Sequence, residues 1–150
     1  MIYIFIILGI FIGELYLKNY IEKQEENKQI ATILMNKIRI RKYHNFGAFL
    51  NIMEKHQKIL YLLSILFTLI LTLFFLLTLG QKGQRLLKFG LSLLLGGAFS
   101  NTYDRLKRKY VVDYFSFQSP FPKLNRIVFN LSDFCIMIGA MIFIICHTNS

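Results

Sequence analysis

Two aspartates in the last third of the chain, Asp113 and Asp133, have the chemistry to act together on one water molecule. Asp133 lies inside an apolar run, residues 127–146, where an ionised side chain costs at least about 2.5–3.5 kcal/mol on insertion scales, which indicates a function. Two carboxylates at one water cannot both be ionised comfortably, so the pKa of one rises. The ionised carboxylate then deprotonates the water and the protonated one protonates a leaving amine, which is the chemistry of amide hydrolysis.

Further polar side chains that could support the two aspartates are clustered along the chain. Asn130 lies one helical turn before Asp133, where its amide can orient a carboxylate or a substrate backbone. Arg105 is expected to pair with Asp104 or with a lipid phosphate, and Asn101 lies one turn before both. The clusters cover residues 45–49, 96–105, 111–114 and 129–133.

The composition is that of a membrane protein. Hydrophobic residues make up 55% of the 150 residues, with 15 Phe, no Trp and two Pro, which is unlike a soluble domain. Residues 59–79 carry no charge, and about 20 such residues cross a hydrocarbon core of about 30 Å. We therefore predict an all-α membrane protein, one domain over residues 1–150, with four transmembrane helices at about 2–18, 59–79, 86–101 and 127–146.

The predicted spans and the segments between them suggest how the polar clusters are positioned. The first span is expected to be retained and not cleaved, with Lys18 snorkelling to the interface. Gly90, Gly96 and Gly97 allow neighbouring helices to approach the third span closely. Within the extramembrane segment 20–58, residues 37–41 alternate with period two, which predicts a strand of a small sheet on the membrane. Residues 102–126 are expected to form an interfacial loop.

The net charge of +10 raises the question of a nucleic-acid partner. The basic residues lie beside membrane spans, so lipid headgroups are the nearer phosphates, and we expect lipid contacts and no nucleic acid. Nine basic residues lie in segment 14–58, three in 80–88 and six in 101–126, so the positive-inside rule places the first and third segments in the cytoplasm. The three histidines are scattered, which does not predict a metal site, and no cofactor is expected.

Taken together, the motifs resemble those of the type II, or prolipoprotein, signal peptidases over nearly the whole length. The matching motifs are Asn45-x-Gly47-Ala48, Gly96-Gly97-Ala98-x-x-Asn101-x-x-Asp104-Arg105, Val111-x-Asp113-Tyr114 and Phe129-Asn130-x-x-Asp133, with Gly139. The resemblance implies a membrane aspartic endopeptidase that removes the signal peptide of bacterial prolipoproteins before the diacylglyceryl-modified cysteine. It also implies an active site at the extracytoplasmic face of the bacterial cytoplasmic membrane, opposite to the side given by the charge count.

The resemblance assigns roles to individual residues of this sequence. Asp113 and Asp133 would be the catalytic pair, and neither a metal nor a cofactor would be needed. Prolipoproteins and membrane lipids would be the partners of a monomer. The residues implied in substrate binding or in support of the site are Asn45, Gly47, Asn101, Arg105, Asn130 and Glu14.

Several positions depart from the family pattern and indicate a divergent paralogue with altered substrate range. Glu14 replaces an aspartate, which moves the charge one methylene outward, while Lys18 is retained. Lys109 replaces a glycine at a place where glycine often supplies a positive φ. The other departures are Leu15, a single alanine at Ala48, Ser100 and Ser132.

Two other functions remain open from the sequence. One is a non-catalytic relative that binds lipidated or apolar peptides as a chaperone, immunity or resistance factor, for which binding would survive loss of either aspartate. The other is a small transporter or channel subunit, which rests only on charge within the membrane.

Overall fold

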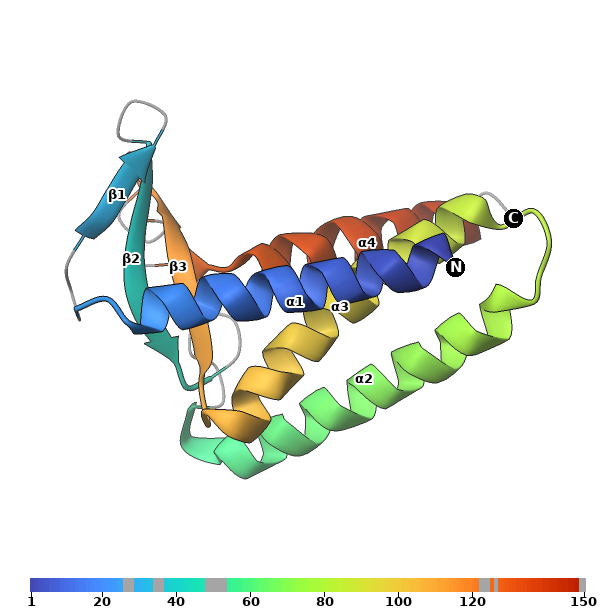
Figure 1. Cartoon of the computed structure of the whole chain (residues 1–150), viewed down its shortest axis with the longest axis horizontal. Helices are drawn as coiled ribbons and strands as arrows, with labels where there is room; N and C mark the ends of the chain where they lie inside the picture. Colours follow the sequence, from blue (N-terminus) through green and yellow to red (C-terminus); the bar gives the residue numbers. More distant parts are fainter. Residues whose placement is uncertain (26–28, 34–36, 48–53, 122–124, 126, 149–150) are drawn as a thin grey trace.

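The computed structural model describes residues 1–25, 29–33, 37–47, 54–121, 125 and 127–148. In these residues long helices run side by side, with an antiparallel sheet at one end and both termini near the other (Figure 1). The helices are α1 (Ile2–Glu22), α2 (Gln57–Leu79), α3 (Arg85–Lys107) and α4 (Leu131–Thr148), and a short 3-10 helix, η2 (Glu54–His56), precedes α2. The strands are β1 (Gln29–Ile33), β2 (Ile38–Asn45), β3 (Val111–Phe117) and β4 (Val128–Phe129).

The helices are suited to a membrane. Among the described residues, α1, α2 and α4 are long and apolar enough to cross a bilayer. Helix α3 is as long as α2 but carries charges near both of its ends, and it packs against the other three helices. The predicted helical membrane fold with a small sheet is thus confirmed at the level of a mostly helical chain with three candidate spans.

Glycines bring α3 unusually close to its neighbours, as the sequence predicted. A Cβ on Gly97 would lie 2.5 Å from the carbonyl oxygen of Ser132 in α4, and a Cβ on Gly139 would lie 2.5 Å from the carbonyl oxygen of Gly90. A Cβ on Gly96 would instead meet Ile10 of α1 at 2.8 Å. Backbones can approach this closely only where side chains are absent. The contact at Gly97 fixes the start of α4 against α3, one turn from Asn101.

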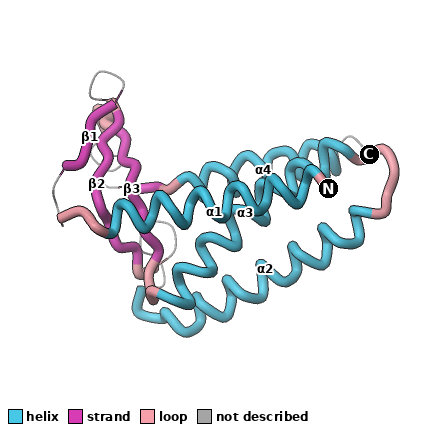
Figure 2. Tube along the Cα trace, in the orientation of Figure 1, coloured by secondary structure: helices cyan, strands magenta, loops and turns pink. Residues whose placement is uncertain are grey.

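The sheet has the order β1-β2-β3-β4, with all neighbours antiparallel. The strand predicted at residues 37–41 is confirmed, since β2 begins at Ile38. The sheet is however not confined to segment 20–58. Residues 111–117, expected in a loop, form β3, and residues 128–129, expected in the last span, form β4 (Figure 2). A strand is stabilised by distant partners, which a local pattern does not reveal.

Two apolar clusters support this arrangement. The first lies between the helices and includes Phe75 of α2 and Leu91 and Leu95 of α3. The second joins the end of α1 to the sheet, where Ile21 packs with Val112 and Tyr114. The second cluster locks β3 to α1, so the orientation of Asp113, which lies between Val112 and Tyr114, is set by the core.

Lys109 has a φ of 72°, as the family pattern with glycine at this place suggested. The residue follows the end of α3, and its carbonyl accepts a hydrogen bond of 2.7 Å from the Tyr61 hydroxyl. We expect Lys109→Gly to raise the free energy of unfolding by about 0.5–1 kcal/mol, because a side chain in the left-handed region costs about 1–2 kcal/mol and the added chain entropy of glycine offsets only part of that gain. Circular dichroism during heating in detergent micelles measures the change.

The matched control for this variant is Lys107→Gly, which places glycine at the last residue of α3. That change should lower the free energy of unfolding by up to about 1 kcal/mol. Equal shifts of the melting temperature in the two variants would contradict the interpretation of Lys109 as a strained residue.

Candidate active site

Asp113 and Asp133 come together where the sheet meets the helices. Asp113 lies in β3 and is buried, and Asp133 lies in the first turn of α4. Asn130 joins them: its side-chain Nδ2 donates to Asp113 Oδ1 at 2.7 Å, and its backbone N–H donates to Asp133 Oδ2 at 3.0 Å. The two carboxylates predicted from remote stretches of sequence are therefore held by one residue.

Asn130 is also the N-cap of α4. Its side-chain Oδ1 accepts a hydrogen bond of 3.0 Å from the backbone N–H of Asp133, while Asp133 Oδ2 accepts the backbone N–H of Asn130. This reciprocal pair has the logic of a capping box, in which cap and third helical residue satisfy each other. The cap restrains both side chains, so the Asp133 carboxylate is positioned by the same bonds that start the helix.

Two further amides complete the carboxylate contacts. Asn45 Nδ2 donates to Asp113 Oδ2 at 2.9 Å, and Asn101 Nδ2 donates to Asp133 Oδ1 at 3.0 Å. The pairing of β2 with β3 brings Asn45 close to Asp113. Tyr43 lies directly opposite Asp113, and Asn45, two residues further along β2, is the diagonal neighbour of Asp113. Each oxygen of the pair thus accepts a hydrogen bond from an asparagine.

The environment of Asp113 raises the pKa of its carboxyl group well above the ordinary value of an aspartate. Burial, followed by the negative charge of Asp133, raises the pKa of Asp113 to about 7, although the hydrogen bonds from Asn45 and Asn130 act in the opposite direction. A buried carboxyl close to a second carboxylate is expected to keep its proton in this way. Asp113 can therefore carry a proton at the pH at which cells operate.

Lys18 is the centre of a buried network behind the aspartates. Its Nζ contacts Asp104 Oδ2 at 3.0 Å, Ser100 Oγ at 3.0 Å and Asn101 Oδ1 at 2.9 Å, and Glu14 Oε2 lies 3.7 Å away. The prediction that Lys18 snorkels to the interface is wrong, because its side chain is only 1% exposed. By holding Oδ1 of Asn101, Lys18 turns the Nδ2 of that amide toward Asp133.

Asp104 was one of the two partners expected for Arg105, the other being a lipid phosphate, but its ion pairs among the described residues are with Lys18 and Arg108. Asp104 binds Lys18 and also Arg108 Nε, at 3.0 Å, and it accepts the backbone N–H of Val112 at 3.2 Å. Lys18 lies in α1, far away in sequence, so no local pattern could reveal this partner. Asp104 ties α1, α3 and β3 together and does not belong to the carboxylate pair.

Glu14 supports the start of α4. Its Oε1 accepts hydrogen bonds from the Ser132 backbone N–H at 2.8 Å and from the Tyr114 hydroxyl at 2.9 Å, and the Tyr114 oxygen accepts the Leu131 N–H at 3.1 Å. Burial and the nearby charge of Glu14 raise the pKa of Tyr114, so the phenol stays a donor. The first N–H groups of α4, which have no partner within the helix, are satisfied in this way.

Arg105 and Gly47 border the carboxylates from the α3 side. Arg105 donates long hydrogen bonds of 3.4 Å to the carbonyl oxygens of Gly47 and Asn101, and its charge interacts with both Asp113 and Asp133. Gly47 also donates its N–H to Asn45 Oδ1 at 3.1 Å. Ala48, the next residue of that motif, lies outside the described residues. All eight predicted site residues therefore lie around one place, with Glu14 one step removed from the carboxylates.

A family model described as signal peptidase (SPase) II matches residues 6–149 of the chain. The chain belongs to the signal peptidase II family. The family match covers both aspartates and every residue that contacts them, so the site lies within the matched region.

Named relatives of this signal peptidase II chain come from several bacteria. The lipoprotein signal peptidase of Latilactobacillus sakei subsp. sakei (strain 23K) is 29% identical over 140 residues, 92% of this chain and 89% of that protein. That of Clostridium tetani (strain Massachusetts / E88) is 36% identical over 101 residues, 67% of this chain and 63% of that protein. That of Shouchella clausii (strain KSM-K16) is 33% identical, and the match covers 69% of this chain and 64% of that protein.

Solved structures of bacterial membrane enzymes share the fold. One, determined by the in meso method at 2.3 Å resolution, has a TM-score of 0.82 and 23% identity, with coverage of 98% of this chain and 87% of that chain. A second, at 1.9 Å resolution, has a TM-score of 0.77 and also 23% identity, with coverage of 96% of this chain and 90% of that chain. The likeness supports a multi-pass membrane protein.

The positions at which this chain departs from the signal peptidase II motifs have local compensations. Glu14, in place of an aspartate, is completely buried and reaches both Tyr114 and the start of α4. Ser100, in place of a glycine, accepts a hydrogen bond from Lys18. Ser132, in place of an alanine, has a buried hydroxyl that makes no hydrogen bond within the structure. The first two substitutions therefore fit the network, whereas the structure gives no reason for the third.

Proposed function

We propose that this chain is an aspartic endopeptidase that cleaves the signal peptide from bacterial prolipoproteins before the diacylglyceryl-modified cysteine. The observation that carries the proposal is the bridging of Asp113 and Asp133 by Asn130 in a chain of the signal peptidase II family. The two carboxyl groups share one proton. The ionised carboxylate removes a proton from water as the oxygen attacks the peptide carbonyl carbon, and the protonated carboxyl donates its proton to the leaving nitrogen as the C–N bond breaks.

The neighbouring residues have supporting roles in this mechanism. Asn45, Asn101 and Asn130 orient the carboxylates through the hydrogen bonds described above. Arg105 and Gly47, whose contacts with each other are long, are assigned to binding of the substrate backbone. A guanidinium near both carboxylates also stabilises negative charge that develops in the tetrahedral intermediate. No step in this scheme requires a metal ion or a cofactor.

We further propose that α3 is a fourth membrane span and that the site faces the extracytoplasmic side of the bacterial cytoplasmic membrane. The sheet, both aspartates and the first turn of α4 lie at one end of the helices, so they share one side (Figure 1). The protein would act as a monomer among phospholipids, without nucleic acid. The count of basic residues favours the reverse orientation.

The orientation is tested with a protease-sensitive tag at the C-terminus, which lies at the end of the helices opposite the sheet (Figure 1). If the sheet faces the extracytoplasmic side, the tag lies in the cytoplasm and should be protected from added protease in intact spheroplasts. Digestion of the tag would overturn the proposed orientation.

The cleavage reaction is tested with purified protein in lipid nanodiscs and a diacylglyceryl-modified prolipoprotein. Mass spectrometry should find a mature product that begins at the lipidated cysteine. The same substrate with its cysteine replaced by alanine cannot be lipidated and should stay intact. Stable binding of the lipidated substrate without any product would instead identify a non-catalytic relative.

The rate of cleavage should depend on pH through Asp113. Because the pKa of Asp113 is raised to about 7, the shared proton is lost as the pH rises above that value, and kcat/KM should fall about tenfold per pH unit. The hydrogen bond from Asn45 stabilises the ionised form of Asp113. Asn45→Ala therefore raises the pKa of Asp113 and should move this alkaline limb of the pH profile to higher pH.

The control is Asn19→Ala, which removes a contact with Arg108 away from the carboxylates. Its alkaline limb should coincide with that of the wild type. A shift of the Asn45→Ala limb to lower pH would show that Asp113 is not the group that titrates.

A further inference from the structure

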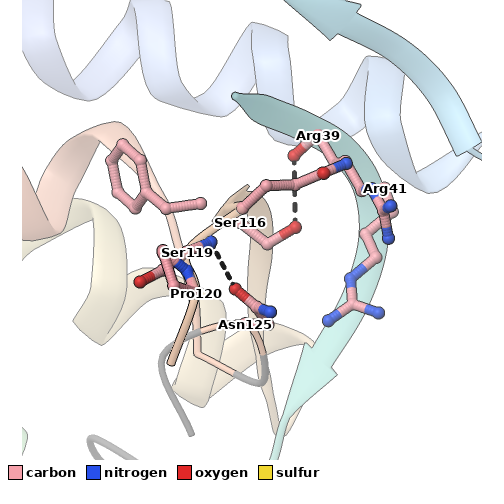
Figure 3. A pocket seen from close by; sticks show the side chains of 8 residues that line it. Arg39, Arg41, Ser116, Ser119, Pro120 and Asn125 are labelled. Atoms are coloured by element: carbon pink, nitrogen blue, oxygen red, sulfur yellow. Dashed lines mark hydrogen bonds between the residues drawn. The ribbon is translucent and has the colours of Figure 1, made fainter. Parts of the chain in front are cut away.

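A polar cavity lies in the sheet, and neither aspartate belongs to its lining. It has a volume of about 240 Å³ and is formed by β2, β3 and the turn that follows β3 (Figure 3). Arg41 and Asn125 lie on opposite sides of the open space in this view. The lining residues are Arg39, Arg41, Ser116, Phe117, Gln118, Ser119, Pro120 and Asn125.

The cavity is positively charged. Arg39 and Arg41 are two residues apart in β2, and both line the cavity. The cavity lining contains no acidic side chain, and neither arginine forms an ion pair with a residue in the described ranges. Arg41 Nε is buried and has no hydrogen-bond partner among the described residues. A buried guanidinium N–H of this kind is available to donate to a bound anion.

Neutral donors complete the lining. Asn125 Oδ1 accepts the backbone N–H of Ser119 at 2.6 Å, which turns the Nδ2 of Asn125 away from that bond. Ser119 Oγ accepts the N–H of Phe121 at 3.2 Å, which leaves its hydroxyl proton to donate. Ser116 Oγ donates to the Arg39 carbonyl at 3.4 Å and holds the wall of the cavity (Figure 3). Guanidinium groups with hydroxyl and amide donors match the several oxygens of a phosphate.

The surroundings of the cavity indicate the source of the phosphate. Phe121, two residues beyond Ser119, is 68% exposed, and Phe117 in the lining is 38% exposed. Phe117 ends β3 and Phe121 follows it, and the sheet lies at one end of helices apolar enough to cross a bilayer (Figure 1). Exposed aromatic rings beside arginines at the end of such helices suit the boundary between headgroups and acyl chains, where anionic lipids attract basic side chains.

We propose that this cavity binds the phosphate group of an anionic phospholipid headgroup, with Phe121 inserted beside it. Arg41 and Arg39 hold the phosphate oxygens, and Asn125 and Ser119 donate to the remaining ones. Because Ser116 and Asp113 belong to the same strand, the bound headgroup anchors β3 at the membrane surface.

Native mass spectrometry of the full-length protein in detergent, titrated with phosphatidylglycerol or phosphatidylcholine, tests the proposal. Wild type should retain phosphatidylglycerol, and the Arg39→Gln/Arg41→Gln variant should bind it at least about tenfold more weakly. The matched control is Lys82→Gln/Arg85→Gln, which removes the same charge at the opposite end of the helices and should change binding less than about twofold. Equal losses in the two double variants would overturn a specific site.

Two further measurements test whether the guanidinium geometry is needed and whether the ligand is a lipid or free phosphate. Arg41→Lys keeps the charge but removes the planar fork, so it should weaken binding by about two- to fivefold while the melting temperature stays that of the wild type. Inorganic phosphate at millimolar concentration should not displace the lipid. Full displacement would overturn the lipid assignment and identify a site for free phosphate. Unchanged lipid binding in the Arg39→Gln/Arg41→Gln variant would overturn the proposal altogether.

Discussion

Asp133→Asn is expected to lower the rate of prolipoprotein cleavage by at least about a thousandfold, because an amide can neither accept the proton of the attacking water nor share a proton with Asp113. The side-chain volume is nearly unchanged. Asp133 accepts hydrogen bonds from Asn101 and Asn130, and asparagine can keep only one of them with its remaining oxygen. The measurement is kcat/KM for the lipidated substrate in nanodiscs, with the melting temperature recorded for each variant.

The Asp113→Asn variant and the Asp113→Asn/Asp133→Asn double variant test whether the two carboxyl groups act together. If the carboxyl groups act as one unit, each single variant and the double variant should lose activity to about the same extent, since loss of one partner already disables the pair. Ser132→Ala is the matched control, because its hydroxyl makes no hydrogen bond although it neighbours Asp133. Cleavage by a folded Asp133→Asn variant at more than a tenth of the wild-type rate would refute the proposed catalytic pair.

Lys18→Met is expected to lower the free energy of unfolding by about 3–5 kcal/mol, the usual cost of removing one partner of a buried ion pair. Lys18 and Asp104 are each 1% exposed, and Glu14 is completely buried. Without the ammonium group, two carboxylates remain in a region that water does not reach. Because the chain lacks tryptophan, the helical circular dichroism signal on heating in detergent is the suitable measurement.

A second substitution separates the effect of charge from that of packing. Asp104→Asn added to Lys18→Met removes one of the two carboxylates that have lost the ammonium group, and it should recover part of the stability. Cleavage should stay low in this double variant, because Asn101 has lost the group that orients its amide. The control is Lys23→Met at the exposed end of α1, where a change below about 0.5 kcal/mol is expected. If the losses of unfolding free energy from Lys18→Met and Asp104→Asn simply add in the double variant, buried charge is not the cause of the instability of Lys18→Met.

The residues that contact the aspartates illustrate what can be predicted from sequence. Asn130 was predicted because it lies three positions before Asp133 and a helix puts both on one side. Gly97 was predicted to allow close helix packing, and the contact with Ser132 confirms it. By contrast, the ion pair of Asp104 with Lys18 was not predicted, and the burial of Lys18 was predicted wrongly. These two depend on contacts between α1 and α3, more than 80 residues apart in sequence.

The sheet also shows that a local sequence pattern does not reveal contacts between distant segments. The alternation in residues 37–41 identified β2, since a half-exposed strand has a period of two. Residues 111–117 and 128–129 were assigned to a loop and a helix, because their strand conformation comes from pairing with β2 and with each other. The pairing carries Asn45 to Asp113, so part of the site depended on a strand that the local pattern did not predict.

The sequence alone indicated a membrane protein of the signal peptidase II type and predicted two aspartates as its reactive groups. Long apolar runs and fixed motif spacings are local properties of the chain, and they survive in any arrangement of the helices. Only the tertiary structure decided that Lys18 is buried, that one asparagine bridges both aspartates, and that two arginines face an open cavity beside β3. Burial and hydrogen bonding join residues from different elements, so they are fixed only when the helices and the sheet pack together.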